Sequence, residues 1–148
     1  MPQLFTGGTV LEEGVHINGI IGTGVFYGPN PNIPNFATIA SQVPFPAGVL
    51  RNLRIMAHAP VELCSDGKLE VTIHSTGKST NSGASDVVAR LEGRSFQAGP
   101  VQVTDSGASK LGVNALDLLR IKVANSLRGV SLPASIMFTY SLEFVAAP

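Results

Sequence analysis

Apolar and polar side chains alternate without interruption along residues 134–145. The even positions are apolar, namely Ile136, Phe138, Tyr140, Leu142 and Phe144. The odd positions are mostly polar, namely Ser135, Met137, Thr139, Ser141 and Glu143. A period of two predicts a β-strand with one buried face, because a helix would place apolar residues three and four apart. A strand with one wet face is typical of antiparallel sheets.

Shorter stretches of the same alternation follow one another along the chain. We expect strands at residues 19–27, 36–43, 49–57, 69–73, 86–92, 100–104 and 116–123, with Phe96 as a further short candidate. Asp66-Gly67 stands between two apolar stretches and predicts a β-hairpin. About eight strands, frequent turns and no convincing helix predict an all-β protein. We expect an antiparallel β-sandwich, and a jelly roll is the favoured architecture.

The first residues do not show this alternation clearly. We predict an irregular N-terminal arm at residues 1–18 and a single jelly-roll domain at residues 19–148. Glycines interrupt the arm, and its apolar residues are Leu4, Phe5, Val10 and Leu11. It is either a loose tail, as termini often are, or an arm that docks on a neighbouring subunit or scaffold.

Composition narrows the possible partners. The 148 residues carry only 14% charged side chains and no formal net charge, against about 25% charged residues in a typical soluble domain. We therefore expect no nucleic-acid partner and no anionic membrane surface as a partner. No apolar stretch approaches the roughly 20 residues that cross a bilayer, and the N-terminus lacks the features of a signal peptide. A surface of Ser, Thr, Asn and Gly suits contact between proteins.

The sequence offers no pattern typical of an enzyme. His16, His58 and His74 are scattered, and Cys64 is the only cysteine, so neither zinc-ligand spacing nor an internal disulfide is available. No Gly-x-Ser-x-Gly motif is present. We predict no catalytic residue, no cofactor and no metal ligand, although the turns near Asp66, Asp86 and Asp105 leave calcium open.

One predicted strand carries two arginines. Arg51 and Arg54 are three residues apart in a predicted strand, so we expect their side chains on opposite faces. One of them would then point toward a sheet interior or a subunit boundary, where a guanidinium pairs well with a carboxylate. The alternative is that both lie on partly wet surface.

Two segments together resemble the opening strands of small trimeric jelly-roll modules. These segments are residues 47–55, Ala-Gly-Val-Leu-Arg-Asn-Leu-Arg-Ile, and residues 67–73, Gly-Lys-Leu-Glu-Val-Thr-Ile. Such modules occur in virion proteins of tailed bacteriophages and at the tips of collagen-like bacterial surface proteins, and they are related in shape to the C1q and tumour-necrosis-factor folds. Residues 113–123 and 136–144 are similar to their last two strands, with Leu116 where a glycine is usual.

The resemblance implies a homotrimer in which the outer face of one subunit's sheet is partly buried against the next. Since the chain has no collagen repeat, it looks most like a capsid decoration (cement) protein, with the major capsid protein as partner. We would then expect it to be made in the host cytoplasm and located on the capsid surface. Capsid contacts are expected at Leu4, Phe5, Val10 and Leu11, and trimer contacts at Leu50, Met56 and Met137. The alternative is a receptor- or glycan-binding tip that uses loops such as residues 75–85.

Overall fold

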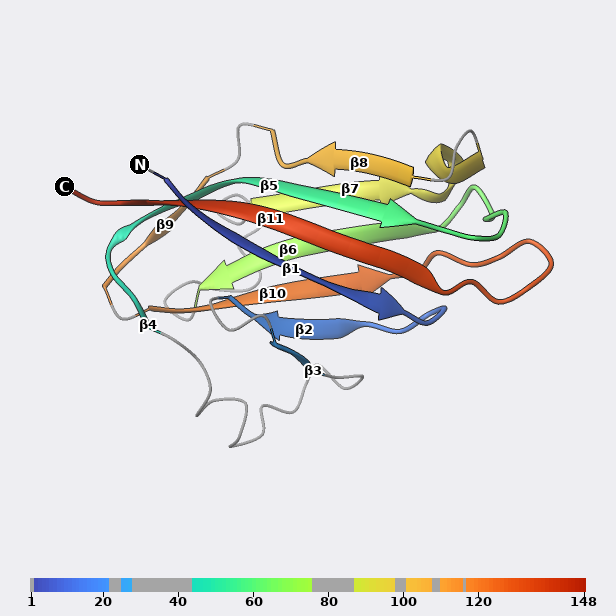
Figure 1. Ribbon diagram of the computed structural model, residues 1–148, viewed down its shortest axis with the longest axis horizontal. Coiled ribbons are helices and arrows are strands. Elements are labelled where there is room, and N and C mark those ends of the chain that lie inside the picture. The colour runs from blue at the N-terminus through green and yellow to red at the C-terminus, as the bar shows by residue number, and fades with distance from the viewer. Residues whose placement is uncertain are drawn as a thin grey trace.

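The structure is a computed structural model of the chain (Figure 1). It describes residues 2–21, 25–27, 44–75, 87–97, 101–107, 110–115 and 117–148. Strands dominate these residues, and the one helical element is a short 3₁₀ turn, η1 (Gly93–Gln97). None of the helices in these ranges is long and apolar enough to cross a membrane.

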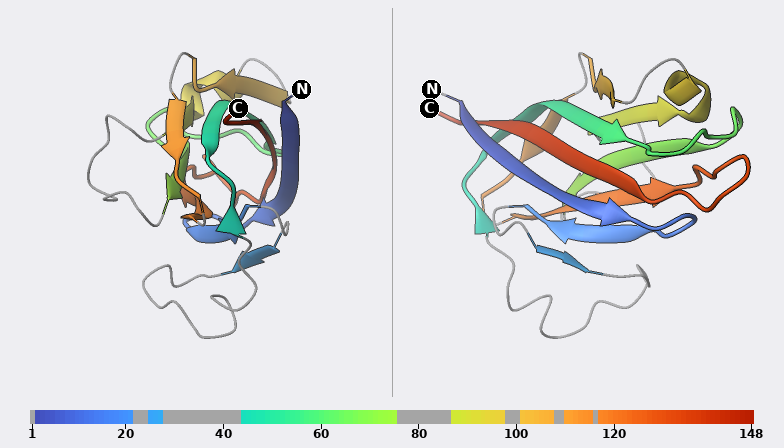
Figure 2. Two further views of the ribbon diagram at one scale, coloured as in Figure 1. Left: turned by 90° about the vertical axis from the view of Figure 1, so that its left-hand side faces the viewer. Right: turned by 45° about the vertical axis from the view of Figure 1, so that its right-hand side comes forward.

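The strands form two antiparallel sheets. The first sheet has the order β1 (Gln3–Leu11), β11 (Ile136–Ala146), β5 (Gly48–His58) and β8 (Val101–Asp105), and β9 (Lys110–Val113) also pairs with β5. The second sheet has the order β3 (Val25–Tyr27), β2 (Ile17–Ile20), β10 (Asp117–Asn125), β6 (Lys68–Ser75) and β7 (Val87–Glu92), and β4 (Pro44–Phe45) also pairs with β10. Figure 2 shows the sheets along the strand direction and places both termini at one end.

The path of the chain between the sheets makes this a jelly roll. The chain passes from β1 to the second sheet, returns for β5, crosses again for β6 and β7, and repeats this exchange through β8, β10 and β11. Exchange of successive strands between two antiparallel sheets is the double-sheet arrangement of this architecture. The predicted all-β antiparallel sandwich is therefore confirmed.

Alternation along the strands fills the core. The even residues of β11 from Ile136 to Phe144 have exposed fractions of 5% or less, and Leu69, Val71 and Ile73 of β6 are fully buried. Leu119, Ile121 and Val123 of β10 meet them from the same sheet. Near the end of the sandwich, Phe45 packs edge-on against Phe5 and Phe144, at centroid distances of 5.2 and 5.5 Å.

The predicted irregular arm is wrong. Residues 3–11 form β1, which pairs with β11 over its whole length, and β2 runs across the predicted boundary between residues 18 and 19. Gly7 lies opposite Tyr140, whose Cε1 would be 2.7 Å from a Cβ at this position. The aromatic ring thus covers the glycine, and this long-range contact supplies the packing that the local sequence lacks.

Three smaller predictions also need correction. Residues 19–27 contain parts of two paired strands, β2 and β3, rather than one strand. Asp66 lies in a turn, but β5 and β6 on either side belong to different sheets and do not form a hairpin. Phe96 lies in the 3₁₀ turn. The predicted strand at residues 36–43 lies outside the described residues, as does the loop at 75–85 except for Ser75.

A bulge in β5 changes the predicted facing of its side chains. Asn52 has φ of 52°, and the register with β11 shifts between Ser141 and Glu143. The extra residue reverses the alternation, so Leu50 and Leu53 are both buried. Ser106 holds the backbone after the bulge, since its Oγ accepts a hydrogen bond from the Leu53 amide at 3.1 Å.

As a result, Arg51 and Arg54 lie on the same face of the first sheet, and the prediction of opposite faces is wrong. Arg51 pairs across to Glu143 of β11, and Arg54 pairs across to Ser141. Both partners are outward residues of β11, because the residues between them and beside them are buried. Two arginines that a regular strand would separate are therefore presented together on the outer face.

Candidate assembly face

The outer face of the first sheet carries most of the exposed large apolar side chains among the described residues. Leu4 and Val10 of β1, Met56 of β5 and Met137 of β11 have exposed fractions of 60%, 57%, 47% and 59%. They are outward members of strands whose alternate residues form the core. A face of this kind is typical of a surface that meets another protein.

Three of these side chains occupy neighbouring outward positions on β1, β11 and β5, and we call them the apolar patch: Val10, Met56 and Met137. Val10 and Met137 lie directly opposite each other in the β1–β11 ladder. Met56 lies opposite Thr139, one outward position along β11 from Met137. Thr139 and Ser141 continue the face without adding charge, and a shallow hollow of about 220 Å³ lies between them and Arg54.

The other half of this face, toward the termini, holds a compact polar group. The Glu143 carboxylate accepts a hydrogen bond from Asn52 Nδ2 at 2.6 Å and lies 3.6 Å from Arg51 Nη2. Lys110 of β9 pairs directly with Arg51. A row of one carboxylate and two cations therefore crosses β11, β5 and β9.

The outer face of the second sheet is different in character. Arg90 of β7 donates hydrogen bonds through Nε and Nη2 to Glu70 of β6, at 2.9 and 2.5 Å, and Lys68 lies 3.9 Å from the same carboxylate. Arg120 and Lys122 add further cations on β10. Charged side chains in exposed pairs are typical of a face that remains in water.

The loops at the far end of the sandwich are fastened by polar contacts. The buried Asn125 side chain donates to the Glu12 carbonyl at 3.1 Å, and its backbone amide donates to His16 Nδ1 at 3.0 Å. Glu13 accepts a hydrogen bond from the Gly129 amide at 2.7 Å. These contacts fix the β1–β2 connection against the β10–β11 connection and so define where the first sheet ends.

An exposed ion pair joins two loops at this same end. Arg128 Nη2 lies 2.6 Å from Asp66 Oδ2. The hydrogen bond and the charge of Arg128 lower the pKa of the Asp66 carboxyl below its ordinary value.

Within the described ranges, no three His, Cys, Asp or Glu side chains gather where they could share a metal ion. Cys64 is half-buried, and its Sγ lies 3.7 Å from the Gly129 carbonyl oxygen. His16 serves a loop contact and His58 lies on the first sheet. Asp105 caps its own turn by accepting from the Gly107 amide at 2.9 Å, while Asp86 lies outside the described residues.

The structure separates the residues predicted for capsid contact into two groups. Leu4 and Val10 point outward, whereas Leu11 is fully buried and Phe5 packs against the core. Among the residues predicted for trimer contact, Met56 and Met137 are exposed and lie diagonally across the β5–β11 ladder, but Leu50 is fully buried. Leu50 therefore belongs to the core, because the bulge at Asn52 turns it inward.

Sequence reasoning missed the row formed by Glu143, Arg51 and Lys110. The signal available was the spacing of Leu50 and Leu53, which is odd for one face of a strand, with an asparagine between them. No protein-family model matches the chain, and no curated protein sequence matches it either.

Proposed function

We propose that this chain is a structural virion protein, a homotrimeric capsid decoration protein that clamps and stabilises a phage head. Its subunits associate through one end of the outer face of the first sheet, the end that carries Val10, Met56 and Met137. The single observation that carries the proposal is the apolar patch on that face, formed by Val10, Met56 and Met137. The proposal also rests on the resemblance of residues 47–55, 67–73, 113–123 and 136–144 to trimeric jelly-roll modules.

The chemistry of the face suits contact with identical copies. Methionine and arginine are enriched at protein interfaces, whereas lysine and glutamate are depleted there. The outward residues of β11 between Met137 and Glu143 are Thr139 and Ser141, and neither carries a charge that association would desolvate. A copy of the chain that covers this face buries methionine and valine side chains, and each CH₂ group removed from water contributes about 0.8 kcal/mol.

The second sheet supports the same assignment by contrast. Its charged pairs, such as Glu70 with Arg90, stay hydrated at little cost when this sheet faces outward in the trimer. To bury them would remove several charges from water, and the desolvation penalty often exceeds the attraction.

The anchor to the shell differs from the sequence expectation. Residues 3–11 are built into the first sheet, so they do not serve as a free arm. The clamp is instead the trimer as a rigid unit, and it stabilises the assembled shell because it binds the shell and not the separated capsomers.

The test has two stages. Sedimentation equilibrium of the purified chain at micromolar concentration is expected to give three times the 15.4 kDa chain mass. The protein is then mixed with heads of the phage that encodes it, where we expect saturable binding in multiples of three chains and a higher melting temperature of the heads. A stable monomer contradicts the trimer, and a trimer that binds host cells and leaves heads unchanged contradicts the capsid role.

A further inference from the structure

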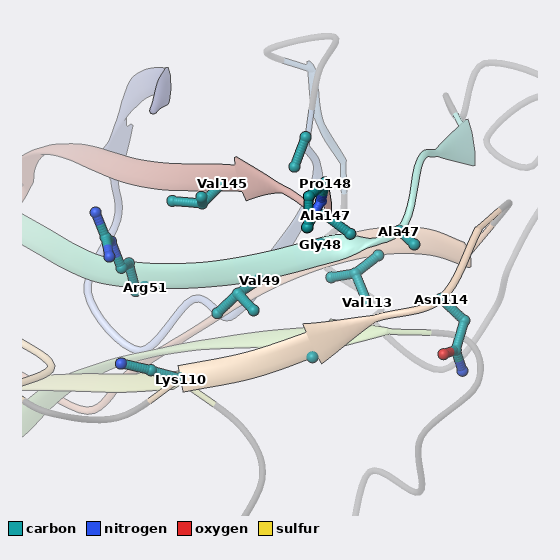
Figure 3. Close-up of a pocket in the computed structure, with 12 residues that line it drawn as sticks. Ala47, Gly48, Val49, Arg51, Lys110, Val113, Asn114, Val145, Ala147 and Pro148 are labelled. Atoms are coloured by element: carbon teal, nitrogen blue, oxygen red, sulfur yellow. The ribbon is translucent and has the colours of Figure 1, made fainter. Parts of the chain in front are cut away.

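A pocket opens at the end of the first sheet where both termini lie (Figure 3). Its volume is about 560 Å³, within the range of about 300–1,000 Å³ typical of small-molecule sites. β5, β9 and the end of β11 surround it. Val49 and Val145, which lie opposite each other in the β5–β11 ladder, supply apolar wall.

One end of this pocket is cationic. Figure 3 shows Arg51 and Lys110 at the same end, with the alanine and valine side chains spread along the rest. Their backbones pair directly across β5 and β9. Like charges in directly opposed positions of a ladder repel each other and destabilise the sheet, so this pairing calls for a compensating negative charge.

The chain supplies only part of that compensation. Glu143 lies 3.6 Å from Arg51 Nη2 and is shared with Asn52. In the part of the chain that the structure describes, no carboxylate oxygen lies within 4.0 Å of the Lys110 ammonium. Arg51 is therefore partly neutralised by Glu143, whereas Lys110 is a cation of the pocket that no carboxylate among the described residues approaches this closely.

A second observation points to a missing acceptor at the same place. Arg51 Nε is buried and has no hydrogen-bond partner among the described residues. Buried polar groups in native proteins nearly always have a partner, and an exception calls for an explanation such as an absent ligand. Nε is enclosed in this conformation, so a carboxylate between Arg51 and Lys110 would accept from it after the partly exposed Arg51 side chain turns toward the pocket.

We propose that this pocket binds a small organic monocarboxylate. Its carboxylate lies between Arg51 and Lys110, and its apolar body extends past Val49 and Val145 over Gly112. A single negative charge matches Lys110, the cation of the pocket that Glu143 does not neutralise, and the apolar wall favours a hydrocarbon body over inorganic phosphate or sulfate. The site is independent of the proposed trimer contact, since the apolar patch lies toward the other end of the face.

The probe is sodium hexanoate, titrated into the ¹⁵N-labelled protein in its native assembly state. We expect saturable shifts confined to amides of residues 48–51 and 110–113. Hexanol, which has the same body without the charge, should bind at least about tenfold more weakly, because hydrogen bonds to charged groups are the stronger ones. Hexylamine and inorganic phosphate should produce no comparable shifts.

Gly112 offers a variant that closes the pocket without disturbing the fold. A Cβ at this position meets no atom within 4 Å, and valine suits a strand. Gly112→Val should abolish hexanoate binding while the melting temperature stays close to that of the parent. Lys110→Gln, an exposed position on the same strand, should weaken binding about tenfold with no packing change.

Lys122→Gln is the matched control, because it removes one positive charge from the outer face of the second sheet. Hexanoate affinity should be unchanged in this variant. Three results would overturn the proposal: no saturable shift up to about 10 mM hexanoate, equal affinity for hexanol, or Gly112→Val binding as tightly as the parent. Equal losses in Lys122→Gln and Lys110→Gln would also overturn it, since they would indicate general charge attraction.

Discussion

Both sheets bury apolar inner faces, but exposed apolar side chains gather on the outer face of the first sheet and not on that of the second, among the described residues. On the first sheet, Met56 and Met137 are exposed, and Thr139 and Ser141 lie on the same face. On the second sheet, Glu70 gathers Lys68 and Arg90 into an exposed network. Alternation therefore determines only which side of a strand is buried within the chain. The choice of residue on the other side determines whether that surface remains in water or meets a partner.

The largest expected effect comes from the inner face of the first sheet. Leu50→Ala should lower the free energy of unfolding by about 2–5 kcal/mol, because Leu50 is fully buried and its loss leaves a cavity. Chemical denaturation at fixed protein concentration measures this. Val130→Ala shortens an exposed apolar side chain in the β10–β11 connection, outside the apolar patch; it is the control and should cost less than about 1 kcal/mol. Unchanged stability in Leu50→Ala would contradict the burial of Leu50 and indicate that its side chain lies on the outer surface.

The comparison of the outer faces is tested directly by equal substitutions on each. Met137→Lys places a charge in the apolar patch, where association would bury it without a partner. We expect the association constant to fall by about 100-fold or more, measured by sedimentation equilibrium. Thr72→Lys makes the corresponding change on β6 of the second sheet and should leave association intact. The reverse pattern would assign the assembly face to the second sheet.

The bulge at Asn52 places both arginines on the outer face of the first sheet, and its contribution to stability can be measured. Asn52→Ala loses the hydrogen bond to Glu143 and puts alanine at a φ of 52°. Each loss costs about 1–2 kcal/mol, so the free energy of unfolding should fall by about 2–4 kcal/mol. Asn52→Gly loses only the hydrogen bond and should cost about 1 kcal/mol. Equal values for the two variants would show that backbone conformation contributes nothing at the bulge.

These residues also show how far sequence alone determines the structure. β11 was predictable because its alternation is uninterrupted from Ile136 to Phe144. β1 was not, because Gly7 and Gly8 weaken the local preference and the covering ring comes from Tyr140, far along the chain. The turn at Asp66 was predictable. The local sequence does not show that β5 and β6, on either side of it, belong to different sheets, because this depends on the strands with which each of them pairs.

The candidate face was half predictable for the same reason. Met56 and Met137 follow from alternation, because the strands that carry them are regular at those positions. Leu50, Arg51 and Arg54 could not be placed, because a single residue with positive φ shifts the phase of everything on one side of it. The cationic end of the pocket depends further on β9 pairing with β5, which is a contact between distant parts of the chain.

A smaller effect is expected on the charged face. Arg90→Ala removes both hydrogen bonds to Glu70, yet exposed pairs typically contribute only about 0.2–1 kcal/mol. Denaturation should therefore show a loss within that range, and the oligomeric mass should not change. Arg90→Lys keeps the charge and serves as control. A loss of association in Arg90→Ala would mean that this network, and not the apolar patch, lies between subunits.

The smallest effect concerns the exposed pair at the loop end, which tests whether charge outside the first sheet acts only locally. Arg128 lowers the pKa of Asp66, so Arg128→Ala should raise this pKa toward the ordinary value of about 3.9. Above that value Asp66 is charged in both the folded and unfolded states, and the stabilisation by the pair is fully present. As the pH falls through the lowered pKa, the folded carboxylate takes up a proton and this stabilisation is lost.

The stability difference between parent and variant should therefore shrink below about pH 4, while association through the first sheet stays the same across that range. Carboxyl-carbon NMR titration measures the pKa, with Arg90→Ala as the control that leaves Asp66 unchanged. An identical Asp66 pKa in parent and Arg128→Ala would contradict the ion pair in solution.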